Sequence, residues 1–342
     1  MKTEEVARDV NKMPIKIRVS LASAILLGLT DGFMDAKPTT IYLLTYRDGK
    51  CTANCSFCSQ ARESTSRANM LSRVIWPVFP TREVIEYIKK MEKNVQRICI
   101  QAMNYPDVFK DVIELVRRIH AEVNIPISIS CQPLTPEQMR KLKEENVDKI
   151  GIPLDAATEK LFEEAKGSSV GGPYLWEKSL EALRNAVQIF GRGRVSTHFI
   201  VGLGENDEEL ISMIQRVVDL GVYPALFAFT PLNGTRLEGK AQPEVERYRC
   251  IQLAQFLITS GKAAIKDILF DEEGHIRGYN INEDIVRETA IMGVPFLTSG
   301  CPGCNRPYYN ERAGGPLYNY PRSMSSEEIV EVNEGIRRYL HG

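Results

Sequence analysis

Short apolar stretches alternate along most of this chain with longer stretches in which apolar residues recur at helical spacing. Stretches rich in β-branched and aromatic residues predict strands, at residues 39–46, 95–102, 126–131, 149–154, 194–201, 225–230 and 265–270. Helical spacing predicts helices between them, at residues 81–93, 107–122, 135–146, 175–190, 205–220 and 244–260. The first of these helices is expected to be capped near Thr81, which follows Pro80 and shortly precedes Glu83.

Repeated strand and helix units of this kind build parallel sheets with helices outside. We therefore expect an α/β fold, a TIM-type (β/α) barrel that is complete or partial. Residues 1–38 are expected to form a helical segment outside the barrel, residues 39–281 the barrel, and residues 282–342 a C-terminal extension.

The composition indicates an ordinary soluble globular protein. The chain has 342 residues, 43% of them hydrophobic, and a formal charge of -1, enough for one large core or two modest ones. No apolar run approaches the roughly 20 residues of a membrane span, and residues 1–14 are too charged for a signal peptide. We expect a cytoplasmic protein without a membrane partner, and the balanced charge does not indicate a nucleic-acid surface.

Three cysteines follow the first predicted strand directly. Cys51, Cys55 and Cys58 form a CxxxCxxC pattern. Iron–sulfur clusters normally take four thiolates, so three neighbouring cysteines indicate an iron with one open site. A structural zinc knuckle is the alternative, but structural zinc prefers CxxC pairs with a fourth ligand nearby, and neither a histidine nor a further cysteine follows closely.

The cysteine spacing, the preceding strand and the aromatic Phe57 before the last cysteine resemble the radical S-adenosylmethionine (SAM) superfamily. The resemblance implies that Cys51, Cys55 and Cys58 ligate a 4Fe-4S cluster. It also implies that the amino and carboxylate groups of SAM bind the fourth iron. Phe57 would lie at this cofactor site, and no side chain is expected to act as a catalyst, because the radical forms on the cofactor.

The segment HFIVGLGE, residues 198–205, resembles the GxIxGxxE segment of the same superfamily. His198 replaces its first glycine, and we expect this histidine to orient a bound molecule rather than to catalyse. The resemblance implies that Ile200 lies against adenine and that Gly202 and Glu205 belong to the cofactor site. A glycine-rich turn between a strand and a helix is the alternative.

Asp155 ends another predicted strand, where related enzymes bind ribose hydroxyls, and a carboxylate can accept hydrogens from both. The alternative is a helix cap close to Thr158. The Gly-Gly-Glu motif usual after the second strand is replaced by residues 101–103, QAM. Lys178 is a candidate cation for the cofactor carboxylate, although most lysines in such helices are solvated.

The remaining cysteines suggest a second cluster. Cys301 and Cys304 form a CPGC pair, while Cys99 and Cys131 lie near the ends of the second and third predicted strands. Together these four could ligate a cluster. A separate zinc, a redox dithiol, or inert buried thiols at Cys99 and Cys131 are the alternatives. Cys250 lies within a predicted helix and is expected to be structural.

The chain resembles the biotin synthase group over most of its length, through the segments CSFCSQ, LD and FTPLNGTRL. Biotin synthases insert sulfur into dethiobiotin from a cluster deep in the barrel. Here Ser128 and Ser196 stand where two of the donor-cluster cysteines would be expected. These departures and the segment CPGCNRPYY, residues 301–309, resemble the split lipoyl synthases, in which two biotin-synthase-like proteins replace one lipoyl synthase.

That resemblance implies a radical SAM sulfurtransferase that inserts sulfur into a protein-bound octanoyl or mercaptooctanoyl chain, adding the second sulfur at carbon 6. It implies two 4Fe-4S clusters, SAM, and an auxiliary sulfur-donor cluster on Cys99, Cys131, Cys301 and Cys304. The implied partners are lipoyl-domain proteins (the glycine cleavage H protein or acyltransferase subunits of 2-oxoacid dehydrogenases), the second split lipoyl synthase protein, and reduced ferredoxin or flavodoxin. A biotin synthase, another radical enzyme whose second cluster is not sacrificed, and a zinc-stabilised non-catalytic binding module are the alternatives.

Overall fold

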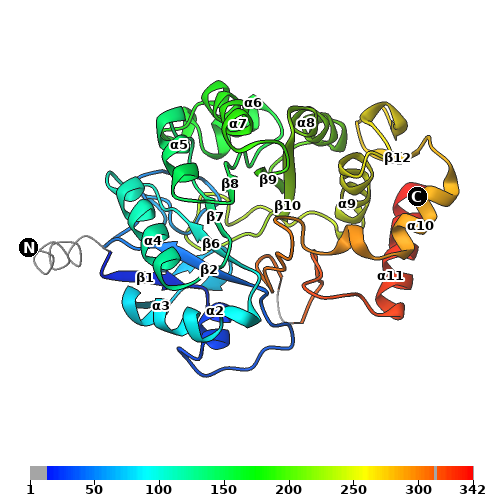
Figure 1. Ribbon diagram of the computed structural model, residues 1–342. Coiled ribbons are helices and arrows are strands. Elements are labelled where there is room, and N and C mark those ends of the chain that lie inside the picture. The colour runs from blue at the N-terminus through cyan, green and yellow to red at the C-terminus, as the bar shows by residue number, and fades with distance from the viewer. Residues whose placement is uncertain (1–13, 312–313, 342) are drawn as a thin grey trace, which may run out of the picture.

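The computed structural model describes residues 14–311 and 314–341, and its centre is the expected parallel sheet (Figure 1). Six adjacent strands are parallel to one another: β2 (Thr40–Thr45), β6 (Arg97–Gln101), β7 (Ile127–Ser130), β8 (Lys149–Gly151), β9 (Val195–Val201) and β10 (Val222–Ala228). Every residue of β2 is buried, as expected for a strand covered on both faces. The fold is α/β and of the TIM type.

Helices follow the parallel strands and cover the outside of the sheet (Figure 1). They are α3 (Thr81–Lys90), α4 (Val108–Glu122), α5 (Pro136–Glu144), α6 (Glu159–Ala165), α7 (Trp176–Phe190), α8 (Asp207–Leu220) and α9 (Val245–Thr259). In α4 the residues Val112, Val116 and Ile119 are buried against the sheet, which is the helical spacing that the sequence shows.

The sheet does not close into a full barrel. The strand order is β10-β9-β8-β7-β6-β2-β1-β5, so β10 pairs with β9 alone among the described residues. Two antiparallel strands, β1 (Lys16–Val19) and β5 (Val78–Pro80), extend the other edge. The sequence predicted only helix before residue 39, but this part contains β1 as well as α2 (Leu21–Leu27). Residues 1–13 lie outside the described residues.

Several predicted boundaries were wrong for local reasons. Strand β8 ends at Gly151, before Pro153, which has no N–H for a strand hydrogen bond. Thr81 does not cap α3, because Pro80 occupies the capping position. The strand predicted at residues 265–270 is a short 3-10 turn followed by β11 (Ile268–Phe270), which pairs with β12 (Ile276–Tyr279) outside the main sheet.

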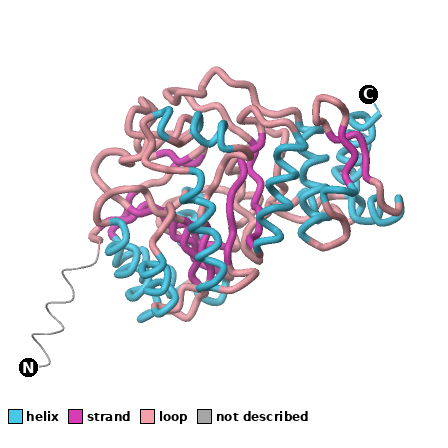
Figure 2. Tube along the Cα trace, turned by 90° about the horizontal axis from the view of Figure 1, so that it is seen from above, coloured by secondary structure: helices cyan, strands magenta, loops and turns pink. Residues whose placement is uncertain are grey.

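The C-terminal part packs beside the barrel. Helix α11 (Ser326–His341) lies against α9 and contacts α10 (Glu283–Ile291), and these helices gather at one end of the molecule together with the β11–β12 hairpin (Figure 2). A small hairpin of β3 (Met70–Leu71) and β4 (Val74–Ile75) follows the cysteine loop. No helix in the described ranges is long and apolar enough to cross a membrane.

Candidate active site

A cavity of about 250 Å³ lies inside the sheet. All seven cysteines predicted as ligands line it, namely Cys51, Cys55, Cys58, Cys99, Cys131, Cys301 and Cys304. Four of the six predicted cofactor-binding residues also line it: Phe57, Asp155, His198 and Ile200. The other two, Gly202 and Glu205, do not border the cavity.

The loop of Cys51, Cys55 and Cys58 follows the carboxyl end of β2 and is held by backbone contacts. The N–H of Ser56 donates to the carbonyl of Ala165 (2.7 Å), and the N–H of Cys51 donates to that of Gln60 (3.0 Å). Two further N–H groups point at sulfur: Asn104 N–H donates to Cys51 Sγ (3.2 Å), and Gln60 N–H donates to Cys58 Sγ (3.4 Å). Such donors stabilise thiolates, the form that binds iron.

The three thiols of this loop line the same cavity and are partly buried. Burial raises the pKa of Cys58 to about 12 and raises that of Cys55 further, and the neighbouring thiols add to both increases. The ammonium of Lys166 opposes the rise at Cys55. Three cysteine thiols on one cavity wall are the donor type that an iron–sulfur cluster takes, so this donor set fits the cluster that the sequence predicts.

A second group of thiols lies deeper in the barrel. Cys99 lies midway along β6, and Cys301 and Cys304 come from the C-terminal loop. Burial raises the pKa of Cys99, and the Cys301 and Cys304 thiols raise it further. The Sγ of Cys301 lies 3.8 Å from the hydroxyl of Ser128, which is the strand partner of Cys99. The Cys99, Cys301 and Cys304 thiols therefore lie near one another along the cavity wall, but no three Cys, His, Asp or Glu side chains of the described residues are arranged to hold a single metal ion.

Cys131 is not part of that group. Burial raises its pKa to about 12, with no contribution from another cysteine. It follows the end of β7, three residues beyond Ser128, which corresponds to about 10 Å along a strand. Cys131 instead lies where the main cavity meets a second cavity of about 390 Å³. The predicted set of four ligands is thus three neighbouring thiols and one separate thiol.

Hydrogen bonds hold the C-terminal loop against the amino-terminal end of β2. The side-chain oxygen of Asn305 accepts from the N–H of Thr39 (3.0 Å), and its amide donates to the carbonyl of Lys37 (2.9 Å). Arg306 N–H donates to the hydroxyl of Tyr42 (2.9 Å), which lies 3.3 Å from Cys304 Sγ. The position of the second thiol group depends on these contacts.

Strand β9 presents Ser196, His198 and Ile200 to the cavity, since alternate residues of a strand face the same side. The ring of His198 lies 5.0 Å from that of Phe227. Burial lowers the pKa of His198 to about 4, and the charges of Arg306 and Lys166 lower it further against the opposing effect of Asp155. His198 is therefore neutral at physiological pH and faces the middle of the cavity.

Glu205 shapes the turn after β9 instead of lining the cavity. Its carboxylate accepts hydrogen bonds from the N–H groups of Gly202 (2.7 Å), Leu203 (3.0 Å) and Gly204 (3.1 Å). Gly202 has φ +103°, a conformation that favours glycine. Both residues thus serve the predicted site indirectly, by fixing the backbone beside Ile200.

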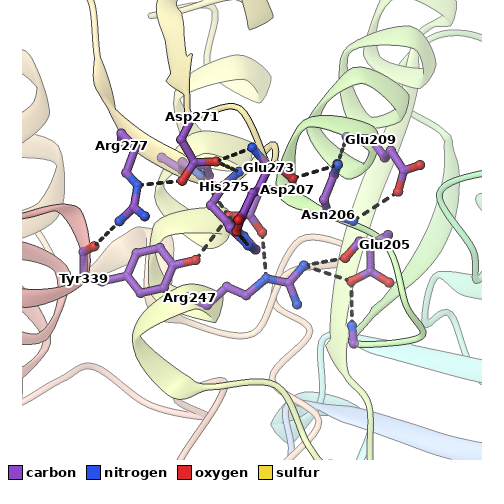
Figure 3. A network of polar contacts seen from close by, with 12 residues as sticks. Glu205, Asn206, Asp207, Glu209, Arg247, Asp271, Glu273, His275, Arg277 and Tyr339 are labelled. Carbon is purple, nitrogen blue, oxygen red and sulfur yellow. Dashed lines mark hydrogen bonds and ion pairs between the residues drawn. The ribbon is translucent and has the colours of Figure 1, made fainter. Parts of the chain in front are cut away.

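Figure 3 shows the network behind this turn. Arg247 on α9 donates to the carboxylates of Glu205 (3.3 Å) and Asp207 (2.7 Å), whose side chains are 1% and 0% exposed. Asp207 also accepts from the N–H of Ile276 (3.0 Å) and the hydroxyl of Tyr339 (3.4 Å). One arginine therefore connects the turn after β9 with the C-terminal hairpin and α11.

Lys178, the predicted cation, does not reach the cavity. It is exposed on α7 and paired with Glu181. Lys166 is the lysine that lines the cavity, where it pairs with Asp155 at 2.7 Å. Arg306 also lines the cavity, with its guanidinium 4.1 Å from the centre of the Phe227 ring. The sequence did not reveal Lys166, because a single lysine after a short helix has no distinctive pattern. Arg306 has a sequence signal, since it follows the CPGC pair by two residues.

Comparison with known proteins agrees with this geometry. Residues 49–217 match the model of the Radical SAM superfamily. The chain carries a radical SAM domain. This domain contains the cysteine loop, Asp155 and the turn after β9, and members of the superfamily use a 4Fe-4S cluster and SAM.

Curated relatives of this radical SAM enzyme are biotin synthases. The chain is 26% identical to the biotin synthase of Picosynechococcus sp., over 63% of this chain and 59% of the relative. It therefore spans less than two thirds of that relative's length. It is 24% identical to the biotin synthase of Persephonella marina, over 75% of this chain and 73% of the relative. The chain is therefore similar to biotin synthases, at modest identity, over most of its length.

Solved structures show the same fold at low sequence identity. Methylornithine synthase superposes with a TM-score of 0.51 and 17% identity, over 70% of this chain and 68% of the other. The FeFe-hydrogenase maturase of Carboxydothermus hydrogenoformans superposes with a TM-score of 0.53 and 18% identity, over 88% of this chain and 66% of the other.

We predict that Arg247→Gln lowers the free energy of unfolding by about 3–5 kcal/mol, because it leaves two buried carboxylates without their cation. Urea unfolding measures this. Arg287→Gln, which breaks an exposed pair with Asp284, is the control and should change the stability by less than about 1 kcal/mol. Equal stability of the two variants would contradict the prediction.

We also predict a pH effect from His198. Its pKa is lowered in the folded chain, so the unfolded chain binds more protons between pH 6.5 and pH 4, and stability falls as the pH falls through that window. His198→Gln should remove about 2 kcal/mol of the stability loss between pH 7 and pH 5, measured by urea unfolding of the metal-free chain. His341→Gln, a histidine substitution at the exposed end of α11, is the control for the substitution itself. An unchanged pH dependence in His198→Gln would show that this histidine titrates normally.

Proposed function

We propose that this radical SAM enzyme inserts sulfur into a protein-bound octanoyl or mercaptooctanoyl chain, adding the second sulfur at carbon 6. The observation that carries the proposal is the presence of two separate thiol groups on one cavity, Cys51, Cys55 and Cys58 at the mouth and Cys99, Cys301 and Cys304 deeper. When bound, the first cluster with SAM supplies hydrogen abstraction from an unactivated carbon, and a second cluster supplies sulfide.

Apolar residues of the same cavity suit an aliphatic chain. Ile129, Ile200, Phe227 and Phe229 border the cavity, and apolar surfaces of this kind bind methylene groups by excluding water. The acyl chain must be held close to both thiol groups, because a carbon radical has to meet sulfur before it meets another partner. The protein's part is therefore to position the acyl chain and keep the cavity dry.

The second thiol group favours the lipoyl type over biotin synthesis. The resemblance to biotin synthases places a ligand cysteine at the position of Ser128, and here the Cys301 thiol from another segment lies 3.8 Å from the Ser128 hydroxyl. The CPGC pair thus supplies thiols that β7 and β9 lack. Biotin synthesis remains the second candidate, supported by the biotin synthase relatives.

The proposed partners follow from the substrate. A protein-bound acyl chain requires a lipoyl-domain protein, either the glycine cleavage H protein or an acyltransferase subunit of a 2-oxoacid dehydrogenase. The first sulfur would come from the second split lipoyl synthase protein. Reduced ferredoxin or flavodoxin would deliver the electrons.

We predict that the anaerobically reconstituted enzyme, given SAM and a reductant, adds one sulfur to a mercaptooctanoyl-lysyl peptide and forms 5′-deoxyadenosine. The unmodified octanoyl-lysyl peptide should gain less, because the first sulfur belongs to the partner. Mass spectrometry of the peptides measures both. Sulfur transfer to dethiobiotin alone would support biotin synthesis instead, and colourless protein containing zinc but no iron would support the binding module.

We further predict that Cys301→Ser lowers the iron content from about eight to about four atoms per chain, the loss of one 4Fe-4S cluster, and abolishes sulfur transfer while SAM cleavage continues. Cys131→Ser should retain all the iron, because Cys131 lies apart from the other thiols. Cys250→Ser is the control, since Cys250 is buried within α9. Iron loss in Cys131→Ser and not in Cys301→Ser would reverse the assignment.

A further inference from the structure

Lys166 follows the end of α6, and its side chain is 2% exposed. Its ammonium donates to Asp155 Oδ2 (2.7 Å) and to the carbonyl of Pro153 (2.9 Å), and lies 5.0 Å from the centre of the Tyr174 ring. Buried lysines are rare and need a partner for their charge. Lys166 and Asp155 both line the cavity, so this ion pair faces the place where a ligand binds.

The backbone of Asp155 is held independently of its side chain. Its N–H donates to the carbonyl of His198 (2.8 Å), and its carbonyl accepts from the N–H of Ile200 (2.8 Å). Asp155 has φ +66°, a region that costs a non-glycine residue about 1–3 kcal/mol and persists only where the surroundings enforce it. The backbone thus directs this carboxyl group toward the cavity.

The ion pair decides which oxygen of Asp155 is available. Oδ2 accepts from Lys166, and no residue in the described part of the chain donates to Oδ1. The ammonium also compensates the charge of a carboxylate that is 8% exposed. What remains is a single fixed acceptor on the cavity wall, suited to one hydroxyl group of a ligand.

We propose that Lys166 is a positioning residue for SAM binding. Lys166 holds Asp155 by Oδ2 and leaves Oδ1 of Asp155 to accept a hydrogen bond from one ribose hydroxyl of SAM. This differs from the expectation that the Asp155 carboxylate accepts both hydroxyls. Lys166 acts through Asp155 and does not touch the cofactor. The inference rests on the radical SAM domain and is independent of which molecule accepts the sulfur.

Binding measurements without turnover test the proposal. SAM and its 2′-deoxy and 3′-deoxy analogues are bound by equilibrium dialysis to the anaerobically reconstituted full chain, with no reductant present. In the parent, one deoxy analogue should bind about 10- to 100-fold more weakly than SAM, as expected for a hydrogen bond to a charged group, and the other should bind like SAM. Equal losses for both analogues would overturn the proposal.

Variants of the pair then separate positioning from contact. Lys166→Met and Asp155→Asn should each weaken SAM binding and abolish the difference between the two analogues, and the double variant should be no weaker than the weaker single one. Lys160→Met, at an exposed lysine of α6, is the matched control and should keep the parent affinity and the difference. Discrimination that persists in Lys166→Met would overturn the proposal.

Lys166→Met leaves a buried carboxylate without its cation. If it does not yield folded protein, the double variant Lys166→Met with Asp155→Asn is compared with Asp155→Asn alone. Equal SAM affinities support a role through Asp155. A further loss of more than about threefold in the double variant would show that Lys166 itself contacts SAM, and the proposal would fall.

Discussion

The sheet of this protein leaves one side open. Asn305, which accepts from the N–H of Thr39, and Arg306, whose N–H donates to Tyr42, hold a C-terminal loop against that side. The loop is tied to β2 through Thr39 and Tyr42, and to β10 through the hydroxyl of Ser299, which accepts from the N–H of Leu226 (2.8 Å). Since β2 and β10 are the first and last parallel strands, the loop spans the gap between them. Two of the thiols in the deeper group depend on this placement.

A second segment covers the same side nearer the mouth. After the cysteine loop, the N–H of Thr65 donates to the carbonyl of Gly234 beyond β10 (2.9 Å), and Ser72 donates to the carbonyl of Tyr309 in the C-terminal loop (3.0 Å). The segment after the cysteine loop and the C-terminal loop are therefore in contact. Together they cover the open side of the partial barrel, which suits radical chemistry because it limits the access of water and competing reactants.

Polar and charged groups of the cavity are each held by particular neighbours. Lys166 is paired with Asp155, Arg306 lies over the face of Phe227, and His198 is neutral because burial lowers its pKa to about 4. Outside the cavity, Arg247 compensates Glu205 and Asp207 behind the turn after β9. The polar groups that line the cavity are thus fixed in position before any ligand binds, so little reorganisation is needed on binding.

Much of this organisation follows from local sequence. The alternation of strands and helices, the cysteine loop after β2 and the segment from His198 to Glu205 each depend on residues close together in the chain, so periodicity and spacing predict them. The exact ends of elements depend on single residues, such as Pro153 after β8 and Asn206 at the N-terminal cap of α8. The resemblance to biotin synthases likewise rests on short segments of sequence.

The tertiary structure alone decided which thiols meet and which charges pair. Cys99 and Cys301 are about two hundred residues apart in sequence, and only the docking of the C-terminal loop brings them together. Cys131 looked equivalent to Cys99 because both were predicted near strand ends. The strand partner of Cys99 is Ser128, and Cys131 lies three residues beyond Ser128, which corresponds to about 10 Å along a strand. Lys166 carried no sequence signal, since its role depends on burial beside Asp155. Spacing in the chain determines local geometry, whereas distances between distant segments depend on packing.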